Sequence, residues 1–212
     1  AFPPKGHPTC EVASWKRIFE ICKDHGLNHV RYHTFTPPEA AFTAADEVGI
    51  ILQPEMPLWG RVQWGSKAAA FVWLESERIL DYYGNHPSFA MYSLGNEHAG
   101  EWDALDSMVV ALKKKDPRPL YAGCANEYIR PKDPGYPVSP NDDFATIMWG
   151  KERANEDERP RARYMERFLD KDEQVAMDQD WGGIMEGFPV PPIVHELGQW
   201  WTFPNMQEIE KY

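Results

Sequence analysis

The sequence predicts an α/β fold in which parallel strands alternate with helices and form a (β/α)8 TIM barrel that is incomplete. Short apolar runs typical of buried strands alternate along the chain with segments of helical periodicity. Most strands are separated by a helix, which is the usual connection between parallel strands. Six strands can be counted in 212 residues, whereas a complete barrel has eight strands and typically about 250 residues.

The helices are predicted from their periodicity and from the residues that end them. In the first helix, Trp15, Ile18, Phe19 and Cys22 follow the i, i+3, i+4, i+7 spacing of one helical face, and Gly26 ends the helix. Two prolines open the second helix and a glycine closes it. Helices are predicted at residues 11–25, 39–48, about 67–83 and about 101–115, with a last helix beginning at Pro204.

The strands are predicted from apolar runs that contain few polar residues. Ile50, Ile51 and Leu52 form one such run, which ends at Pro54. An unbroken apolar run is typical of a strand that is buried on both faces. Five more strands are predicted at residues 28–33, 88–94, 119–125, 143–149 and 192–197.

The composition excludes several classes of protein. The formal net charge is −11, so we expect no nucleic-acid partner, because phosphate groups require clustered Lys and Arg. No run of about 18 apolar residues occurs, so we expect no membrane-spanning segment. The three cysteines fit neither a disulfide framework nor a zinc site. Residues 151–180 contain seven basic and ten acidic side chains, which predicts a solvated insertion between two strands.

Two predicted strands end in a glutamate, where the active site of a parallel barrel lies. Glu97 follows Asn96 at the end of one strand, and Glu196 ends another. Two carboxylates that face one pocket are the minimum requirement for glycoside hydrolysis. The alternative is that each glutamate caps a helix or pairs with an arginine. His195 precedes Glu196, so its side chain is predicted to point to the opposite side, outside the barrel.

Three segments resemble family 2 glycoside hydrolases, which include β-galactosidases, β-glucuronidases and β-mannosidases. Residues 85–97 run from N-H-P-S through an apolar strand to S-L-G-N-E and resemble the acid/base strand of that family. Residues 26–49 resemble its second strand and the following helix, and residues 192–198 resemble its nucleophile strand. The resemblance implies that residues 1–212 are part of a catalytic barrel that contains strands two to seven. It also implies that strands one and eight and the preceding β-sandwich domains of the same polypeptide are missing.

The resemblance implies a role for each matching residue. Glu97 would be the general acid/base, and Glu196 would be the nucleophile. Asn96 would hydrogen-bond the sugar 2-hydroxyl, and Arg31 would keep Glu196 ionised. The implied activity is that of a retaining exo-glycosidase, which removes a terminal β-linked sugar by double displacement and needs no cofactor. The expected partner is a glycoside or oligosaccharide substrate.

Four further residues are candidates for contact with the sugar. His33 either reaches the pocket or only satisfies local hydrogen bonds. Glu55 matches an acidic position that binds Mg²⁺ in some β-galactosidases, but Pro57 occupies the second ligand position, so we expect no metal. Glu55 is expected to bond a sugar hydroxyl or a neighbouring strand end instead. Trp149 stands where the family usually has a tyrosine; it and Trp200 either stack on sugar rings or pack on the barrel rim.

Two other functions compete with hydrolysis by paired carboxylates. A degenerate glycosidase would bind carbohydrate without cleaving it, and the tryptophan at position 149 and the missing strands favour this alternative. A metal-dependent barrel hydrolase would need clustered His and Asp residues at the strand ends, which the sequence does not offer.

Overall fold

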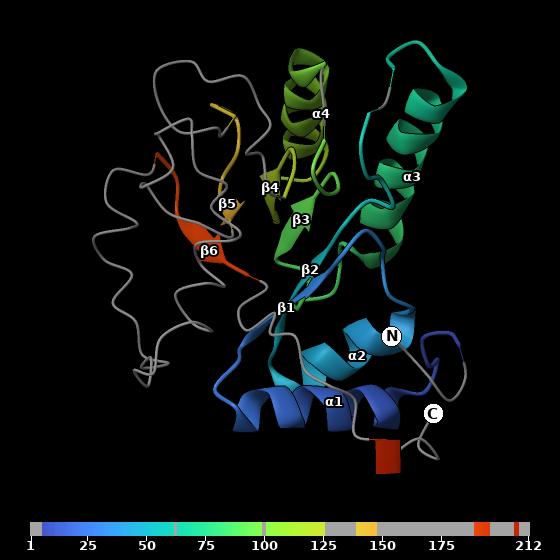
Figure 1. Cartoon of the computed structure of the whole chain (residues 1–212), viewed down its shortest axis with the longest axis vertical. Coiled ribbons are helices and arrows are strands. Elements are labelled where there is room, and N and C mark those ends of the chain that lie inside the picture. Colours follow the sequence, from blue (N-terminus) through green and yellow to red (C-terminus); the bar gives the residue numbers. More distant parts are fainter. Residues whose placement is uncertain are drawn as a thin grey trace.

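The computed structural model describes residues 6–61, 63–98, 101–125, 139–147, 189–195 and 206–207. Within these ranges the chain forms four α-helices and six short strands (Figure 1). The insertion predicted at 151–180 and nearly all of the helix predicted from Pro204 lie outside the described residues. In chain order the elements are α1 (Val12–Asp24), β1 (His29–Tyr32), α2 (Glu39–Val48), β2 (Ile51–Pro54), α3 (Lys67–Tyr83), β3 (Met91–Ser93), α4 (Trp102–Lys115), β4 (Leu120–Ala122), β5 (Ala145–Ile147) and β6 (Pro192–Val194).

The described strands pair in parallel, as the alternation of strands and helices predicts. β1 pairs with β2, β3 with β4, and β5 with β6. Single parallel bridges from Leu52 to Phe89 and from Glu55 to Ser93 join β2 to β3, so the first four strands lie side by side in chain order. The structure therefore confirms an α/β fold with parallel strands. In the described part of the chain these strands do not close into a barrel.

The helices match their predicted bounds more closely than the strands do. α2 and α3 begin and end at the predicted residues, α1 is one residue shorter at each end, and α4 begins one residue later. The strand predicted at 88–94 contains only β3, because the Ala90 N–H bonds back to the Ser88 carbonyl in a turn. β4 begins after Pro119, which has no N–H to donate to a ladder.

Local sequence explains how two helices end or begin. α2 ends at Gly49, which adopts a φ of 76° in the left-handed region that glycine enters without steric cost. α3 begins after Ser66, whose hydroxyl accepts a hydrogen bond from the Ala69 N–H at 3.2 Å. This bond satisfies one of the free N–H groups of the first turn.

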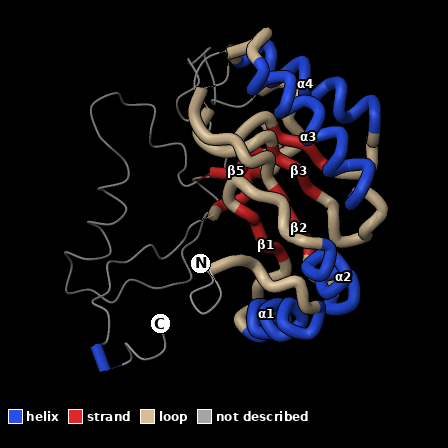
Figure 2. The backbone as a smooth tube through the Cα atoms, turned by 90° about the vertical axis from the view of Figure 1, so that its right-hand side faces the viewer, coloured by secondary structure: helices blue, strands red, loops and turns tan. Residues whose placement is uncertain are grey.

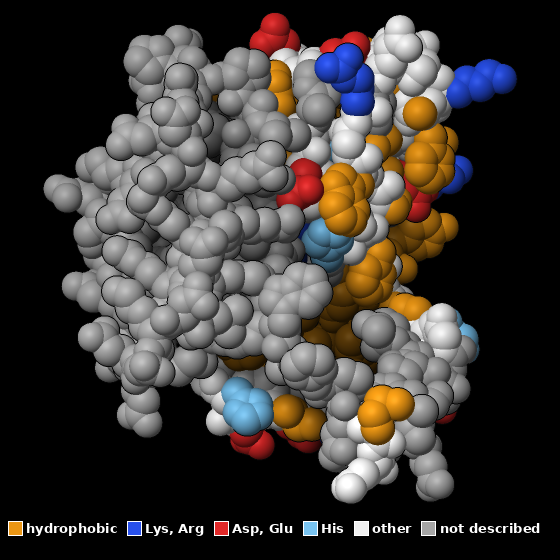
Figure 3. Space-filling view, viewed as in Figure 1, with side chains coloured by type: hydrophobic (Ala, Val, Ile, Leu, Met, Phe, Trp, Pro, Cys, Tyr) orange, Lys and Arg blue, Asp and Glu red, His pale blue; other side chains and the backbone are white. Residues whose placement is uncertain are grey.

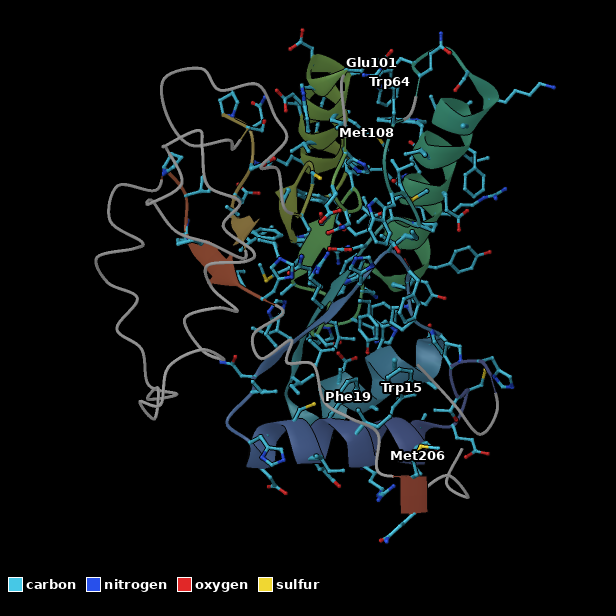
Figure 4. The ribbon with its side chains drawn as sticks, viewed as in Figure 1. Trp15, Phe19, Trp64, Glu101, Met108 and Met206 are labelled. Atoms are coloured by element: carbon cyan, nitrogen blue, oxygen red, sulfur yellow. The ribbon has the colours of Figure 1, made fainter. Side chains whose placement is uncertain are left out.

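The core lies between the helices and the strands. Figure 2 shows the helices outside the layer of strands, and Figure 4 shows Trp15 and Phe19 pointing from α1 toward α2. Their rings stack with centroids 5.6 Å apart, and both side chains are buried. Each such burial contributes roughly 1.5–3 kcal/mol. Four alanines on α2 are also buried and allow α1 to approach closely. None of the described helices has the length and apolar character needed to cross a membrane.

Candidate functional site

Side chains from four strands meet at the carboxyl edge of the sheet. Arg31 lies near the end of β1, Glu55 directly follows β2, Asn96 follows β3, and His195 directly follows β6. Parallel strands place their carboxyl ends at one edge, so residues far apart in the sequence come together there. The sequence predicts Arg31, Glu55 and Asn96 as site residues, but it assigns Arg31 to Glu196 rather than to the other two.

Arg31 is the centre of this cluster. Its Nε donates to Glu55 Oε1 at 2.5 Å, and its Nη2 donates to Glu55 Oε2 at 3.1 Å. Nη2 also donates to Asn96 Oδ1 at 2.7 Å, and Nη1 lies 2.7 Å from His195 Nδ1. The side chains of Arg31 and Glu55 are 8% and 0% exposed, so water screens this ion pair little. The fork of the guanidinium therefore fixes the orientation of all three partners.

Glu55 is enclosed within the protein. Besides Arg31, the backbone N–H of Thr34 donates to its Oε2 at 2.9 Å. Thr34 adopts a φ of 56°, which turns its N–H toward the carboxylate as the chain leaves β1. Of the two contacts that the sequence leaves open for Glu55, the structure contains the one with a neighbouring strand end. Its contact with a sugar stays a prediction.

Glu97 projects in a different direction from Asn96. Asn96 is buried, whereas Glu97 is half-buried and has a φ of 50°. Its own N–H donates to the Ala125 carbonyl at 2.9 Å, which anchors the backbone beside the end of β4. The indole Nε1–H of Trp59 donates to its carboxylate Oε2 at 3.2 Å. The carboxylate is therefore partly accessible and is held by a hydrogen bond.

His33 lies beside Trp59. The two rings meet edge-on, with centroids 4.9 Å apart, and Trp59 is 62% exposed. Acidic, hydrophobic and histidine side chains gather next to one another on the face drawn in Figure 3. His33 also contacts the Thr34 hydroxyl through Nδ1 at 3.3 Å. The structure thus contains the local hydrogen bond that the sequence leaves as one alternative for His33, and also sets its ring beside the partner of Glu97.

The prediction that His195 points away from the site is wrong. Its Nδ1 faces the Arg31 guanidinium, and burial, helped by the charges of Arg31 and His33, lowers the pKa of His195 to about 3. The ring is therefore neutral near pH 7, and Nδ1 accepts a hydrogen bond from Arg31. The prediction assumed that side chains alternate between the two faces of a strand as far as Glu196. β6 ends at Val194, so this alternation does not apply to His195.

Three predicted site residues lie outside the described residues: Glu196, Trp149 and Trp200. Glu196 is the next residue after His195, which the structure holds against Arg31. Among the described residues, no group of three or more His, Cys, Asp and Glu side chains could hold a metal ion.

Comparison with known proteins gives relatives in sequence and in structure. No family model matches the chain. A protein from Formosa agariphila, provisionally named a β-glucuronidase, is 31% identical over 87 residues, which are 39% of this chain and 10% of that protein. An FMN-binding β-glucuronidase from F. prausnitzii L2-6 superposes with a TM-score of 0.54 and 20% identity, covering 64% of this chain and 22% of that chain.

Two further β-glucuronidases give similar values. The enzyme from Parabacteroides merdae has a TM-score of 0.52 and 18% identity, over 66% of this chain and 18% of that chain. The enzyme from an uncultured Clostridium has a TM-score of 0.52 and 19% identity, over 64% of this chain and 25% of that chain. At these identities the likeness is one of fold. The chain spans a quarter or less of the length of each of these proteins.

Proposed function

We propose that the chain is part of a retaining exo-glycosidase of the family 2 type that hydrolyses a terminal β-linked sugar. In this proposal its strands are strands two to seven of a TIM barrel. The observation that carries the proposal is the strand-end cluster, in which a buried Arg31 joins Glu55, Asn96 and His195 beside the accessible carboxylate of Glu97. The likeness in fold to β-glucuronidases supports the same reaction class.

In the first step Glu97 protonates the leaving oxygen while Glu196 attacks the anomeric carbon. The glycosidic bond breaks, a covalent glycosyl-enzyme forms, and the aglycone leaves with the proton of Glu97. In the second step Glu97, now ionised, takes a proton from water, which attacks the anomeric carbon and releases Glu196. The sugar leaves with its original anomeric configuration.

Asn96 is prepared for contact with the sugar. A guanidinium can only donate, so the Asn96 atom that faces Arg31 must be the amide oxygen. The amide NH₂ is then oriented as the donor, and we assign it to the sugar 2-hydroxyl. Hydrogen bonds to this hydroxyl strengthen in the oxocarbenium-like transition state.

The enzyme is tested with aryl β-glycosides, beginning with the glucuronide because the structural relatives are β-glucuronidases. Galactosides and mannosides follow. In the complete protein, Glu97→Gln should lower kcat for a phenyl glycoside by at least about 100-fold, since acid–base catalysis contributes about 10²–10⁴. Glu196→Gln should abolish turnover, because the covalent glycosyl-enzyme can no longer form. Glu47→Gln is the matched control, because Glu47 forms only a surface ion pair with Lys16.

Three measurements address the retaining mechanism. NMR of the first product formed should give the β-anomer, and a 2-deoxy-2-fluoro glycoside should label Glu196, as peptide mass spectrometry would detect. A carboxyl separation between Glu97 and Glu196 of about 5–5.5 Å in a crystal structure agrees with retention, and about 6.5–9.5 Å implies inversion. Oligosaccharide binding without turnover by the wild-type protein would refute hydrolysis and favour a carbohydrate-binding protein.

A further inference from the structure

We infer that Trp59 is a positioning residue for Glu97, whose indole N–H holds one carboxylate oxygen and leaves the other to transfer the proton. The inference rests on the proposed role of Glu97 as acid/base. Three observations carry it: the backbone pairing of the two segments, a buried histidine that packs between them, and the indole contact itself.

The backbones of the two segments are paired. Trp59 forms a parallel bridge with Asn96, and the Asn96 N–H donates to the Leu58 carbonyl at 3.0 Å. Trp59 therefore lies beside the residue that immediately precedes Glu97. At Gly95, whose φ is 131°, an added Cβ would lie 2.3 Å from the Leu58 carbonyl oxygen. Only glycine allows the two segments to approach this closely.

His98 lies buried between the same two segments. Its Nε2 lies 2.9 Å from the Leu94 carbonyl, its Nδ1 lies 3.2 Å from the Gly60 carbonyl, and the residue is 2% exposed. Burial lowers the pKa of His98, and a neutral ring has one N–H, so it donates to only one of the two carbonyls. The backbone bond from Asn96 to Leu58, with His98 packed beside it, thus holds Trp59 and Glu97 on neighbouring segments.

The hydrogen bond between Trp59 and Glu97 has a defined direction and lies at the protein surface. An indole nitrogen can only donate, so Trp59 binds Glu97 Oε2 as an acceptor. Within the described part of the chain no group hydrogen-bonds Oε1. Trp59 is 62% exposed, so core packing does not account for its place, and His33 supports its ring edge-on. This geometry fixes the orientation of the carboxylate and leaves Oε1 for proton transfer.

The contact is tested first by NMR on the ¹⁵N-Trp-labelled chain, because this measurement does not depend on activity. Trp59→Phe assigns the Trp59 indole resonance by its loss. In Glu97→Ala that resonance should move upfield and its proton should exchange faster with water. Glu101→Ala is the matched control: Glu101 has a φ of 49°, close to the 50° of Glu97, and accepts its hydrogen bond from the Trp64 backbone N–H (Figure 4). It should leave the Trp59 resonance in place.

The effect of Trp59 on catalysis is tested by measuring how kcat depends on the leaving group of the substrate. Trp59→Phe keeps an aromatic ring beside His33 and removes the N–H donor. We expect kcat for a phenyl glycoside, which needs protonation, to fall about tenfold. We expect the value for a dinitrophenyl glycoside, which leaves without an acid, to change by less than about threefold. Trp64→Phe is the control. It should leave kcat unchanged for both glycosides, because the bond from Trp64 to Glu101 comes from the backbone N–H.

Each outcome decides the inference. An unmoved indole resonance in Glu97→Ala would overturn it. A rise in KM at constant kcat would make Trp59 a sugar platform, and an equal loss for both leaving groups would mean a structural role; either would also overturn it. If the wild-type protein cleaves no glycoside, the proposed function fails, while the NMR result still decides whether Trp59 positions Glu97.

Discussion

Replacing Arg31 with methionine should destabilise the fold more than any surface charge substitution. The change removes the guanidinium and keeps a long apolar stem. Glu55, whose side chain is 0% exposed, would lose both bonds from Arg31 and keep the one from the Thr34 N–H. An ionised carboxylate that is buried in this way loses the opposite charge that offsets its desolvation.

The expected cost follows from the burial of the pair. Removing one partner of a buried ion pair costs about 3–5 kcal/mol, because the other charge stays buried. In a chain of 150–250 residues each kcal/mol shifts Tm by about 2–4 °C, so Arg31→Met should lower Tm by roughly 6–20 °C. The double variant Arg31→Met/Glu55→Leu should recover much of this loss, because neither charge then remains.

Thermal unfolding followed by circular dichroism measures the effect, and urea unfolding gives the free energy. Lys16→Met is the control: it removes an ion pair to Glu47 of similar length, 2.7 Å, between side chains that are 39% and 49% exposed. This variant should barely change Tm. A drop in Tm for Arg31→Met that is no larger than for Lys16→Met, or a double variant less stable than Arg31→Met, would refute the reasoning.

Three other substitutions test separate features of the fold. Gly95→Ala should abolish activity and lower Tm, because the new Cβ would lie 2.3 Å from the Leu58 carbonyl oxygen; a fully active variant would contradict this. Burial lowers the pKa of His86, but hydrogen bonds to the carboxylates of Asp46 and Glu39 have a larger effect and raise this pKa above 6.5. The stability that His86 contributes is therefore present below pH 6.5 and is lost as the pH rises through the raised value; urea unfolding of His86→Gln should show a weaker loss over this range, and an unchanged profile would exclude His86 as its source. Ser66→Ala removes the N-cap bond of α3 and should cost about 1 kcal/mol in urea unfolding, whereas Ser66→Gly should cost only a few tenths.

The sequence alone determined the α/β class and the helices. The periodicity of α1, the glycine after α2 and the capping serine before α3 are local signals, because helical hydrogen bonds join residues close in the chain. The candidate acid, Glu97, could also be identified from the sequence. Glu97 stands out because a charged residue at the end of an apolar strand requires a partner or a function.

Tertiary structure decided how the site is assembled. Arg31 bonds residues that lie 24, 65 and 164 positions further along the chain, and no periodicity predicts such distant partners. The inward position of His195 depends on β6 ending one residue earlier. The contact of Trp59 with Glu97 depends on the fit between two strand ends. Local patterns specify which residues form strands and helices, whereas the packing of those elements determines which side chains meet at the strand ends.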